Sequence, residues 1–350
     1  MSDADLTQQL PAEFVERLQN IVPRERFEAV LRSFAVAKRP SGRVNALRAD
    51  PRAVLAELRA AGIGLEPVAW LPEGATLPAE QKPLLTALPA VLQGRFYVQG
   101  LASMLAAPAL APQPGEEVLD LAAAPGGKTL HLAALMQGVG RLAAVESVRG
   151  RFFTLRENLA RAGAEFVDTY CADGRTIGRK TPERFDRVLL DAPCSSEARF
   201  QCRDPTSWQY WGPRKIAENS RKQKALLRSA LEAVKVGGVV LYCTCALAPE
   251  ENELVVAHTL RRLAGGVAVA PPALPGDPLV TGPTAGHRNM LPGAVELAPL
   301  AVPVDHVQPG LAAWHGKSFP AELARCVRVL PTGDCDAFFL AKLVKLRSFV

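Results

Sequence analysis

The spacing of apolar residues changes near residue 95 and divides the chain into two parts. In residues 1–95, apolar side chains recur at helical spacing in two segments, and a third helix is expected to begin at Pro51, because proline suits the first turn of a helix. Short apolar stretches between these segments predict strands. We therefore predict a small N-terminal α+β domain. Its expected helices are Phe14–Leu18, Phe27–Phe34 and Pro51–Ala61, and its expected strands are Arg43–Leu47 and Leu65–Trp70.

From Phe96 onward, short apolar runs alternate with helical patterns. This alternation predicts a Rossmann-like, doubly wound parallel α/β sheet over residues 96–350. Ligands of such sheets bind beyond the carboxyl ends of the strands, so the residues after each strand are the first candidates for chemistry. The expected strands are Val118–Leu121, Arg141–Val145, Phe166–Tyr170, Arg187–Leu190 and Val239–Cys243, and the expected helices are Lys128–Met136, Phe152–Ala162 and Arg221–Val234.

Residues 271–310 interrupt this pattern, because nine of these forty residues are proline and few are charged. We predict a long irregular insertion that could act as a partly ordered lid. After it, the alternating stretch Ala337–Val344 predicts a strand that closes the edge of the sheet.

Composition and charge exclude several classes of protein. With 48% apolar and 22% charged residues, the chain can bury a large core, which excludes disorder as its main character. We expect no secretory signal, because the first thirty residues hold acidic side chains and no apolar core. We also expect no membrane span, because the longest apolar run, Leu101–Leu110, is interrupted by Pro108 and too short. Seven cysteines, an odd number, favour free thiols over disulfides. We expect a cytoplasmic monomer.

The glycine-rich stretch Asp120–Thr129 follows the first strand of the sheet and allows three interpretations. A phosphate loop would need glycine where Ala122 stands, and a plain tight turn would need no ligand. A nucleoside cofactor explains more: Gly126 and Gly127 would let backbone N–H groups approach an anionic group, and Glu146, twenty residues beyond Gly126, would bind ribose hydroxyls. The spacing favours a nucleoside cofactor without identifying it.

Cys194 and Cys245 follow the fourth and fifth strands, so they should face the same cleft. A lone cysteine is usually a small core residue, but two thiols at strand ends indicate chemistry. Cys243, two residues from Cys245, would share its face if the strand ran straight. A zinc site is disfavoured, because the chain has no C-x-x-C pair and its five histidines are scattered. We expect no metal.

Together these motifs resemble the Sun/Nop family of RNA (cytosine-5) methyltransferases, which includes RsmB- and RsmF-type enzymes. The resemblance runs from about Arg43 to Lys345 and includes the turn Asp191-Ala-Pro-Cys-Ser195, the strand end Thr244-Cys245, and Pro249-Glu-Glu-Asn-Glu253. Arg328-Val-Leu-Pro331 and Phe338-Phe-Leu-Ala-Lys342 extend it. Three positions depart from the family pattern, in which a cysteine would replace Ala122, a glycine would replace Ser196, and Ser-Thr-Cys-Ser would replace Cys243–Ala246.

The resemblance implies a class I methyltransferase sheet, S-adenosylmethionine as cofactor, RNA as partner and an RNA-binding type of N-terminal domain. It assigns the thiolate that attacks carbon 6 of cytosine to Cys245 and assistance of product release to Cys194. Asp191 would contact the base at N3 and N4, and Lys128 could support the thiolate or simply start a helix. The expected cofactor-binding residues are Ala122, Ala123, Ala124, Pro125, Gly126, Gly127, Lys128, Glu146, Arg151, Asp173 and Asp191, with Asp173 meeting the adenine amine.

DNA cytosine-5 methyltransferases offer an alternative arrangement, in which the attacking cysteine stands in the Pro-Cys turn and Cys194 would be the nucleophile. Thr244-Cys245 favours the RNA arrangement instead. A small-molecule or protein methyltransferase would leave the second cysteine unexplained. A non-catalytic RNA-binding assembly factor would leave the intact site unexplained. Ribosomal RNA is the expected substrate and transfer RNA the alternative.

The segment Arg199–Arg228 concentrates positive charge, with eight Lys or Arg against two acidic residues. Phe200, Trp208, Tyr210 and Trp211 lie among them. Basic groups with aromatic faces suit a phosphate backbone and unstacked bases, although a solvated helix face would look similar. The cytosine should be single-stranded or flipped, because a stacked base hides its target atom. The expected RNA contacts are Arg199, Arg203, Arg214, Lys215, Arg221 and Lys222.

Overall fold

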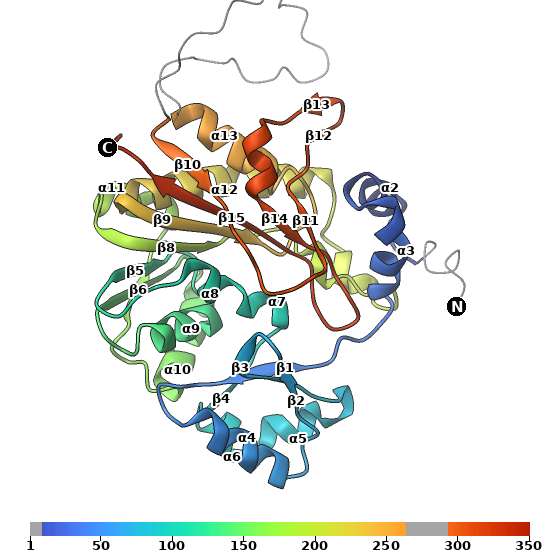
Figure 1. The fold of residues 1–350 in the computed structure, drawn as a ribbon, viewed down its shortest axis with the longest axis vertical. Coiled ribbons are helices and arrows are strands. Elements are labelled where there is room, and N and C mark those ends of the chain that lie inside the picture. The colour runs from blue at the N-terminus through green and yellow to red at the C-terminus, as the bar shows by residue number, and fades with distance from the viewer. Residues whose placement is uncertain (1–8, 264–292) are drawn as a thin grey trace, which may run out of the picture.

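The computed structural model describes residues 9–263 and 293–350, which form a large sheet and a smaller sheet with their helices (Figure 1). The large sheet has nine strands in the order β11-β14-β15-β9-β8-β5-β6-β7, with β10 paired to β15. Strands β5 to β9 are parallel to one another, and the remaining strands join antiparallel. The parallel strands are β5 (Glu117–Asp120), β6 (Arg141–Glu146), β7 (Asp168–Cys171), β8 (Phe185–Asp191) and β9 (Val234–Thr244).

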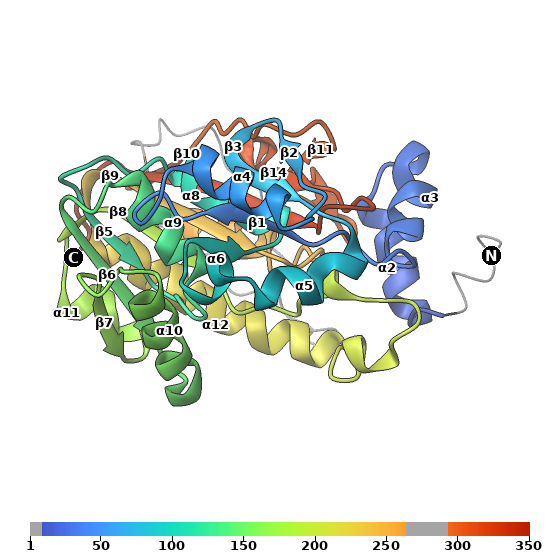
Figure 2. The same ribbon diagram turned by 90° about the horizontal axis from the view of Figure 1, so that it is seen from below.

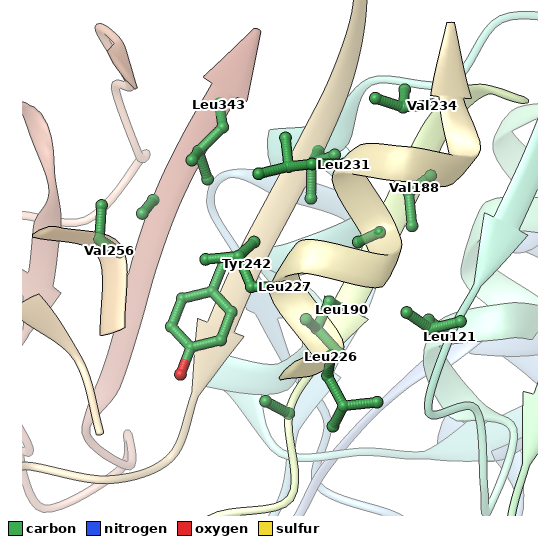
Figure 3. Packing of buried hydrophobic residues seen from close by; sticks show 14 of the residues in the cluster. Leu121, Val188, Leu190, Leu226, Leu227, Leu231, Val234, Tyr242, Val256 and Leu343 are labelled. Carbon is green, nitrogen blue, oxygen red and sulfur yellow. The ribbon is translucent and has the colours of Figure 1, made fainter. Parts of the chain in front are cut away.

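Helices cover both faces of this sheet, as expected for a doubly wound fold, so that prediction is confirmed. Both faces of the sheet are apolar and need such cover. Along β9, for example, Val240 and Tyr242 pack on one face, whereas Leu241 and Cys243 pack on the other. Figure 3 shows Leu226, Leu227 and Leu231 of α12 lying over Val188 and Leu190 of β8. One face carries α11 (Ile177–Lys180), α12 (Pro213–Ala233) and α13 (Glu253–Leu263), and the other carries α7 (Leu101–Met104), α8 (Ala106–Leu110), α9 (Gly127–Leu135) and α10 (Arg149–Arg161).

Helix α12 begins at Pro213, eight residues before the helix predicted from Arg221. Proline supplies the start, because its fixed backbone angle suits the first helical turn. The buried face of these additional turns includes the polar residues Asn219 and Ser220. The spacing of apolar residues therefore did not predict that the helix begins at Pro213. Within the described residues, no helix combines the length and apolar character needed to cross a bilayer.

Two predictions about the C-terminal part are wrong in place or extent. Strand β15 (Phe338–Lys345) does not close the sheet edge, because it pairs with β9 on one side and with β14 (Val327–Val329) and β10 (Val295–Ala298) on the other. Of the predicted irregular insertion, residues 271–292 lie outside the described residues. Residues 293–310 contain β10 and β11 (Val307–Pro309), whose short pairings a proline-rich sequence did not reveal. The ribbon β12 (Ala313–Trp314) and β13 (Lys317–Ser318) follows.

The smaller sheet is antiparallel, in the order β2-β3-β1-β4, and has its own apolar core. Helix α4 begins with its cap satisfied, because the Asp50 carboxylate accepts a hydrogen bond from the backbone nitrogen of Ala53. The last strand of this sheet, β4, begins at Phe96 and so lies beyond residue 95, and the domain division predicted there stays a prediction. The elements are β1 (Ser41–Val44), α4 (Pro51–Ala60), β2 (Glu66–Val68), β3 (Leu71–Thr76), α5 (Lys82–Ala87), α6 (Pro89–Leu92) and β4 (Phe96–Val98).

The first two described helices, α2 (Ala12–Ile21) and α3 (Arg24–Ser33), do not pack on the smaller sheet. Figure 1 and Figure 2 show them at one end of the molecule, and Figure 1 shows them beside the large sheet and apart from α4 to α6. Phe14 lies at the centre of their contact, with its ring centroid 4.8 Å from that of Phe200 and 5.5 Å from that of Phe34. The N-terminal residues thus contribute to two separate apolar cores.

Candidate active site

A cavity of about 330 Å³ opens at the carboxyl ends of the parallel strands, where the strand order reverses between β5 and β8. The glycine-rich turn after β5 forms one wall, and the segment Tyr97–Ser103 forms another. Lys128, Asp191 and Arg199 also line the cavity. Such a switch point is where doubly wound sheets bind their ligands.

The glycine-rich turn ends at Gly126, whose φ of +111° is a backbone conformation that few other residues adopt. Gly127 then opens α9, and a Cβ atom there would lie 2.7 Å from Cε1 of Tyr97. Glycine at 127 therefore makes room for the Tyr97 ring. Arg151 donates a 2.7 Å hydrogen bond to the carbonyl oxygen of Ala124, and Asn158 donates one of 2.8 Å to that of Pro125. Two side chains of helix α10 thus fix the backbone of the glycine-rich turn.

Glu146 ends β6 as predicted and is buried. Its Oε1 accepts a 2.8 Å hydrogen bond from the backbone nitrogen of Val148, and its Oε2 lies 3.6 Å from Nη1 of Arg151. Arg151 therefore links Glu146 to the glycine-rich turn. Neither Glu146 nor Asp173 lines the 330 Å³ cavity.

Asp173 follows β7 and caps the short helix Gly174–Thr176. Its carboxylate accepts hydrogen bonds from the backbone nitrogen of Arg175 at 2.9 Å and from Nη2 of Arg175 at 2.6 Å. These bonds hold the pKa of Asp173 below its usual value. The expected contact with an adenine amine stays a prediction.

Asp120, at the end of β5, was not singled out in the sequence and lines the cavity. Its Oδ2 accepts a 2.7 Å hydrogen bond from the hydroxyl of Thr129, whereas its buried Oδ1 has no hydrogen-bond partner among the described residues. Burial raises the pKa of Asp120 to about 7. Its position at the end of a buried strand was the signal that could have identified it.

The two cysteines meet as predicted, with their sulfur atoms 3.3 Å apart. The hydrogen bond from the Cys194 thiol lowers the pKa of Cys245 to about 7; burial opposes this, and Arg199 and the Ser196 hydroxyl assist it. The Ser196 oxygen lies 3.6 Å from the sulfur of Cys245. The contact with Cys245 and burial raise the pKa of Cys194 well above its usual value. Cys245 is therefore the thiol that ionises first.

Cys243 does not join this pair. Strand β9 ends at Thr244, so Cys245 lies beyond the alternation that would have placed both thiols on one face. Cys243 is buried, and its sulfur lies 3.7 Å from Oδ1 of Asp191. Burial and the charge of Asp191 raise its pKa well above the ordinary value, so it is a poor nucleophile.

Lys128 and Asp191 form an ion pair in the cavity wall, with Nζ and Oδ2 2.7 Å apart. Lys128 also donates a 2.7 Å hydrogen bond to the hydroxyl of Ser103. Burial lowers the pKa of Lys128, but the charges of Asp191 and the nearby thiols outweigh it and raise the pKa overall. Lys128 is therefore protonated and binds the Asp191 carboxylate directly.

The basic segment is divided between two places. Arg199 lines the cavity, whereas Arg203 does not line it and is exposed, and the remaining predicted RNA contacts are exposed along the first half of α12. Lys215 and Lys222 both pair with Glu218, at 3.2 and 2.6 Å. The exposed residues are Arg203, Arg214, Lys215, Arg221 and Lys222.

Three of the four aromatic rings in this segment pack against the core under α2 and α3, among them the partly buried Trp208, whose ring centroid lies 5.9 Å from that of Phe200. Phe200 is buried, and Trp211 packs against Phe14 while its Nε1 donates to the carboxylate of Glu197. Both rings form the core under α2 and α3, which no local pattern could reveal. Tyr210 is 80% exposed, so its ring is the one most available to a base.

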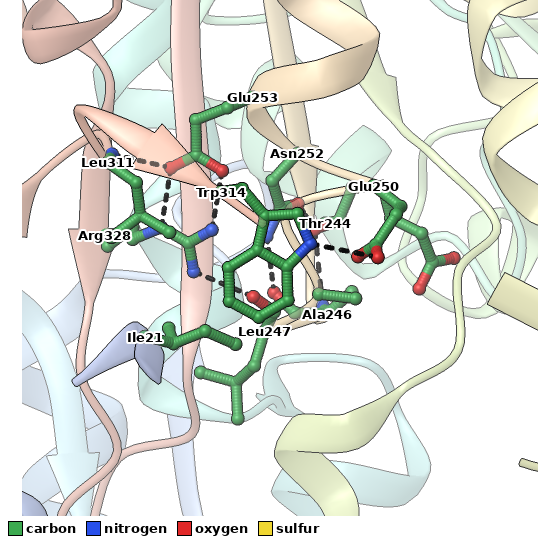
Figure 4. A network of polar contacts seen from close by, with 12 residues as sticks. Ile21, Thr244, Ala246, Leu247, Glu250, Asn252, Glu253, Leu311, Trp314 and Arg328 are labelled. Carbon is green, nitrogen blue, oxygen red and sulfur yellow. Dashed lines mark hydrogen bonds and ion pairs between the residues drawn. The ribbon is translucent and has the colours of Figure 1, made fainter. Parts of the chain in front are cut away.

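The segment Pro249–Glu253 fixes the residues around Cys245 through a network of polar contacts (Figure 4). Asn252 accepts a 2.6 Å hydrogen bond from the Thr244 hydroxyl and donates one of 2.9 Å to the carbonyl oxygen of Ala246. Glu253 forms a buried ion pair with Arg328, whose Nη1 donates to the carbonyl oxygen of Leu247 at 2.8 Å. These contacts hold Cys245 from both sides along the chain.

Comparison with known proteins identifies the family. A family described as "16S rRNA methyltransferase RsmB/F" matches residues 107–344, and one described as "N-terminal domain of 16S rRNA methyltransferase RsmF" matches residues 10–101. This chain belongs to the RsmB/F family. The resemblance drawn from the sequence motifs is therefore confirmed.

Relatives within the RsmB/F family include the "Ribosomal RNA small subunit methyltransferase F" of Pectobacterium carotovorum. It is 38% identical over 253 residues, which are 70% of this chain and 52% of that protein. The protein of the same name from Vibrio campbellii is also 38% identical, over 71% of this chain and 53% of its own length. The chain thus spans about half the length of the curated relatives it matches.

Solved structures show the same fold. A methyltransferase homolog from Pyrococcus horikoshii has a TM-score of 0.77 and 29% identity, with 98% of each chain covered. The NSun6 protein of Pyrococcus horikoshii, described with SFG, has a TM-score of 0.76 over 98% of this chain and the whole of its own. Its identity of 22% supports the fold alone.

Proposed function

We propose that this chain transfers a methyl group from S-adenosylmethionine to carbon 5 of a cytosine in small-subunit ribosomal RNA, through a covalent bond between Cys245 and carbon 6. The observation that carries the proposal is the pair of sulfur atoms, 3.3 Å apart. Neither cysteine lines the cavity, but Cys245 interacts electrostatically with Arg199 and Lys128, which do. The names of the curated relatives support ribosomal RNA over transfer RNA.

The residues around the glycine-rich turn fit S-adenosylmethionine. The unpartnered Oδ1 of Asp120 suits a cationic group, and Glu146 has carboxylate oxygens that suit ribose hydroxyls. Ala122–Lys128 and Arg151 would line the rest, with Asp173 toward the adenine. SFG, which accompanies one structural neighbour, is an analogue of this cofactor. When bound, the cofactor supplies an electrophilic methyl group.

Carbon 5 of cytosine is a weak nucleophile until carbon 6 carries a substituent. The Cys245 thiolate adds to carbon 6, which makes carbon 5 enamine-like. Asp191 accepts a hydrogen bond from the amine at N4, and a proton shared by Asp191 and Lys128 reaches N3, where negative charge develops. After methylation, the protonated Cys194 thiol gives its proton to the departing sulfur of Cys245 as the bond between sulfur and carbon 6 breaks, and the Cys194 sulfur takes up the proton that carbon 5 loses. Cys194 assists this release, and Lys128 keeps Asp191 in place through their 2.7 Å ion pair.

The exposed basic residues from Arg203 to Lys222 would bind the phosphate backbone, and Tyr210 offers a ring for an unstacked base. Arg199 instead belongs to the catalytic cavity, where it favours the Cys245 thiolate.

The experiment that tests the proposal supplies the protein with methyl-labelled S-adenosylmethionine and unmodified small-subunit ribosomal RNA. We expect label at carbon 5 of a cytosine, located by bisulfite sequencing. Label in transfer RNA alone would move the substrate to the alternative class. RNA binding with no label in either would favour a non-catalytic assembly factor.

Cofactor binding is tested separately by calorimetry without RNA. Glu146→Ala should weaken the binding of S-adenosylmethionine by about 1.5–3 kcal/mol, which is the loss expected for hydrogen bonds to a charged group. Glu165→Ala, at an exposed position beyond α10, is the control. Tight binding of ATP by the wild type, with no binding of S-adenosylmethionine, would contradict the proposal.

A further inference from the structure

The segment after β9 contains a fully buried carboxyl group, that of Glu251. Its Oε1 and Oε2 atoms accept hydrogen bonds of 3.0 and 3.2 Å from the backbone nitrogen of Ser195. Oε1 also accepts one of 3.0 Å from Nε2 of Gln223. None of the steps described above uses Glu251, although it contacts the residue next to Cys194.

Gln223 lies in the middle of α12 and is also fully buried. Its Nε2 donates a second hydrogen bond, of 2.9 Å, to the carbonyl oxygen of Pro193. The backbone on both sides of Cys194 is therefore bound by one buried pair of side chains. Because buried polar groups without partners are costly, this pair favours a single conformation of the turn.

Glu251 also belongs to the segment that fixes Cys245. Its neighbour Asn252 binds Thr244 and Ala246, and the hydroxyl of Tyr242 donates to the carbonyl oxygen of Glu251 at 2.5 Å. One short stretch of chain thus sets the positions of both thiols relative to each other.

The charges that face the two thiols differ. Cys194 faces Cys245 and Glu251, and both raise its pKa. Cys245 faces Arg199, which lowers its pKa, and Asp191, which raises it; Lys128 is also near. Glu251 itself faces Glu197, and burial together with that charge raises the pKa of Glu251 to about 7. The effect of Glu251 on Cys194 therefore grows as the pH rises through 7.

We propose that Glu251 is a positioning residue for the thiol pair, which with Gln223 fixes the Cys194 turn beside Cys245 and whose carboxylate keeps the shared proton on Cys194. The inference rests on the proposed function for the roles of the two thiols. The arrangement would leave the nucleophile ionised and its partner protonated, as the proposed reaction requires.

The test measures thiol reactivity in the folded protein without RNA or cofactor, so a failure to methylate RNA leaves it unaffected. Limited alkylation by iodoacetamide between pH 6 and 9 is followed by mass spectrometry of the peptides that contain Cys194 and Cys245. In the wild type, Cys245 should react first, with a midpoint near pH 7. In Glu251→Gln, the ratio of Cys245 to Cys194 alkylation at pH 8 should fall about tenfold, equivalent to one pKa unit.

Glu250→Gln is the matched control, because it removes a carboxylate from the same segment that pairs with Arg17 and Trp314 instead. Its alkylation ratio should equal that of the wild type. An unchanged ratio in folded Glu251→Gln, or an equal fall in Glu250→Gln, would overturn the proposal. If Glu251→Gln does not fold, the test uses Gln223→Met, which removes the hydrogen bond to Pro193 and keeps the Glu251 carboxylate. The alkylation ratio should still fall several-fold in this variant. An unchanged ratio in folded Gln223→Met would also overturn the proposal.

Discussion

The guanidinium of Arg43, on strand β1 of the smaller sheet, donates a 3.0 Å hydrogen bond to the carbonyl oxygen of Gly127, the first residue of helix α9. Arg43 is 1% exposed, and burial lowers its pKa to about 10. Its Nε also donates to Oε1 of Gln99 at 3.3 Å. The smaller sheet is therefore joined to the glycine-rich turn by a buried cation, which makes the turn's position depend on the N-terminal residues.

Replacing this cation should affect both stability and cofactor binding. In Arg43→Met, the acceptors at Gly127 and Gln99 lose their donor, so the free energy of unfolding should fall by about 1–3 kcal/mol, measured by denaturant titration. Calorimetry should also show weaker binding of S-adenosylmethionine. Arg52→Met, on an exposed face of α4, is the control. Unchanged cofactor affinity in Arg43→Met would contradict the link between sheet and turn.

Ser196 adopts a left-handed backbone conformation with a φ of +59°, which is strained for a residue other than glycine. Its hydroxyl oxygen lies 3.6 Å from the sulfur of Cys245. Ser196→Gly should therefore stabilise the fold by about 1 kcal/mol while raising the pKa of Cys245 above about 7. The pH profile of methyl transfer should then move to higher pH. A profile that stays in place would show that the hydroxyl does not act on the thiolate.

The buried ion pair of Arg328 and Glu253 holds the segment after Cys245. Removing one partner leaves an unpaired buried charge, so Arg328→Met should lower the free energy of unfolding by about 3–5 kcal/mol. The double variant Arg328→Met with Glu253→Leu should recover much of this loss, because both charges are then absent. A double variant no more stable than Arg328→Met would contradict this account of the pair.

The order of the motifs along the chain made much of this site predictable. Glu146 and Asp191 end their strands and Cys245 directly follows β9, and parallel strands bring such residues to one edge of the sheet. The same rule would have identified Asp120, which was not singled out in the sequence. Because β9 ends at Thr244, Cys245 rather than Cys243 lies against Cys194. The alternation of residues along the strand could not show where the strand ends.

Other features depend on contacts between distant parts of the chain. Phe200 and Trp211 looked like surface aromatics because their partner Phe14 lies almost two hundred residues earlier. Arg43 gave no local sign of its contact with Gly127. Gln223 lies in the helix predicted from Arg221, and its polar side chain gave no sign that it is fully buried against the Cys194 turn. Long-range packing fixed each of these roles.

Glu218 pairs with both Lys215 and Lys222, and these contacts lower its pKa to about 2. In Glu218→Gln, both lysines become available to phosphates, so RNA should bind more tightly and its affinity should fall more steeply with added salt. Replacing Arg214, Lys215, Arg221 and Lys222 with alanine should flatten the same slope. If neither change alters the slope, the phosphate contacts lie elsewhere, with the N-terminal domain as the next candidate.

The most direct measurement concerns the two thiols, 3.3 Å apart, whose roles differ in this account. Each variant is incubated with RNA and S-adenosylmethionine and then run on a denaturing gel. Cys194→Ala should still attack and methylate but remain bound to its RNA as a slow band, because release requires assistance. Cys245→Ala and the double variant should give no such band, and Cys243→Ser should behave nearly as the wild type. A stable adduct in Cys245→Ala, with none in Cys194→Ala, would make Cys194 the nucleophile and contradict the account.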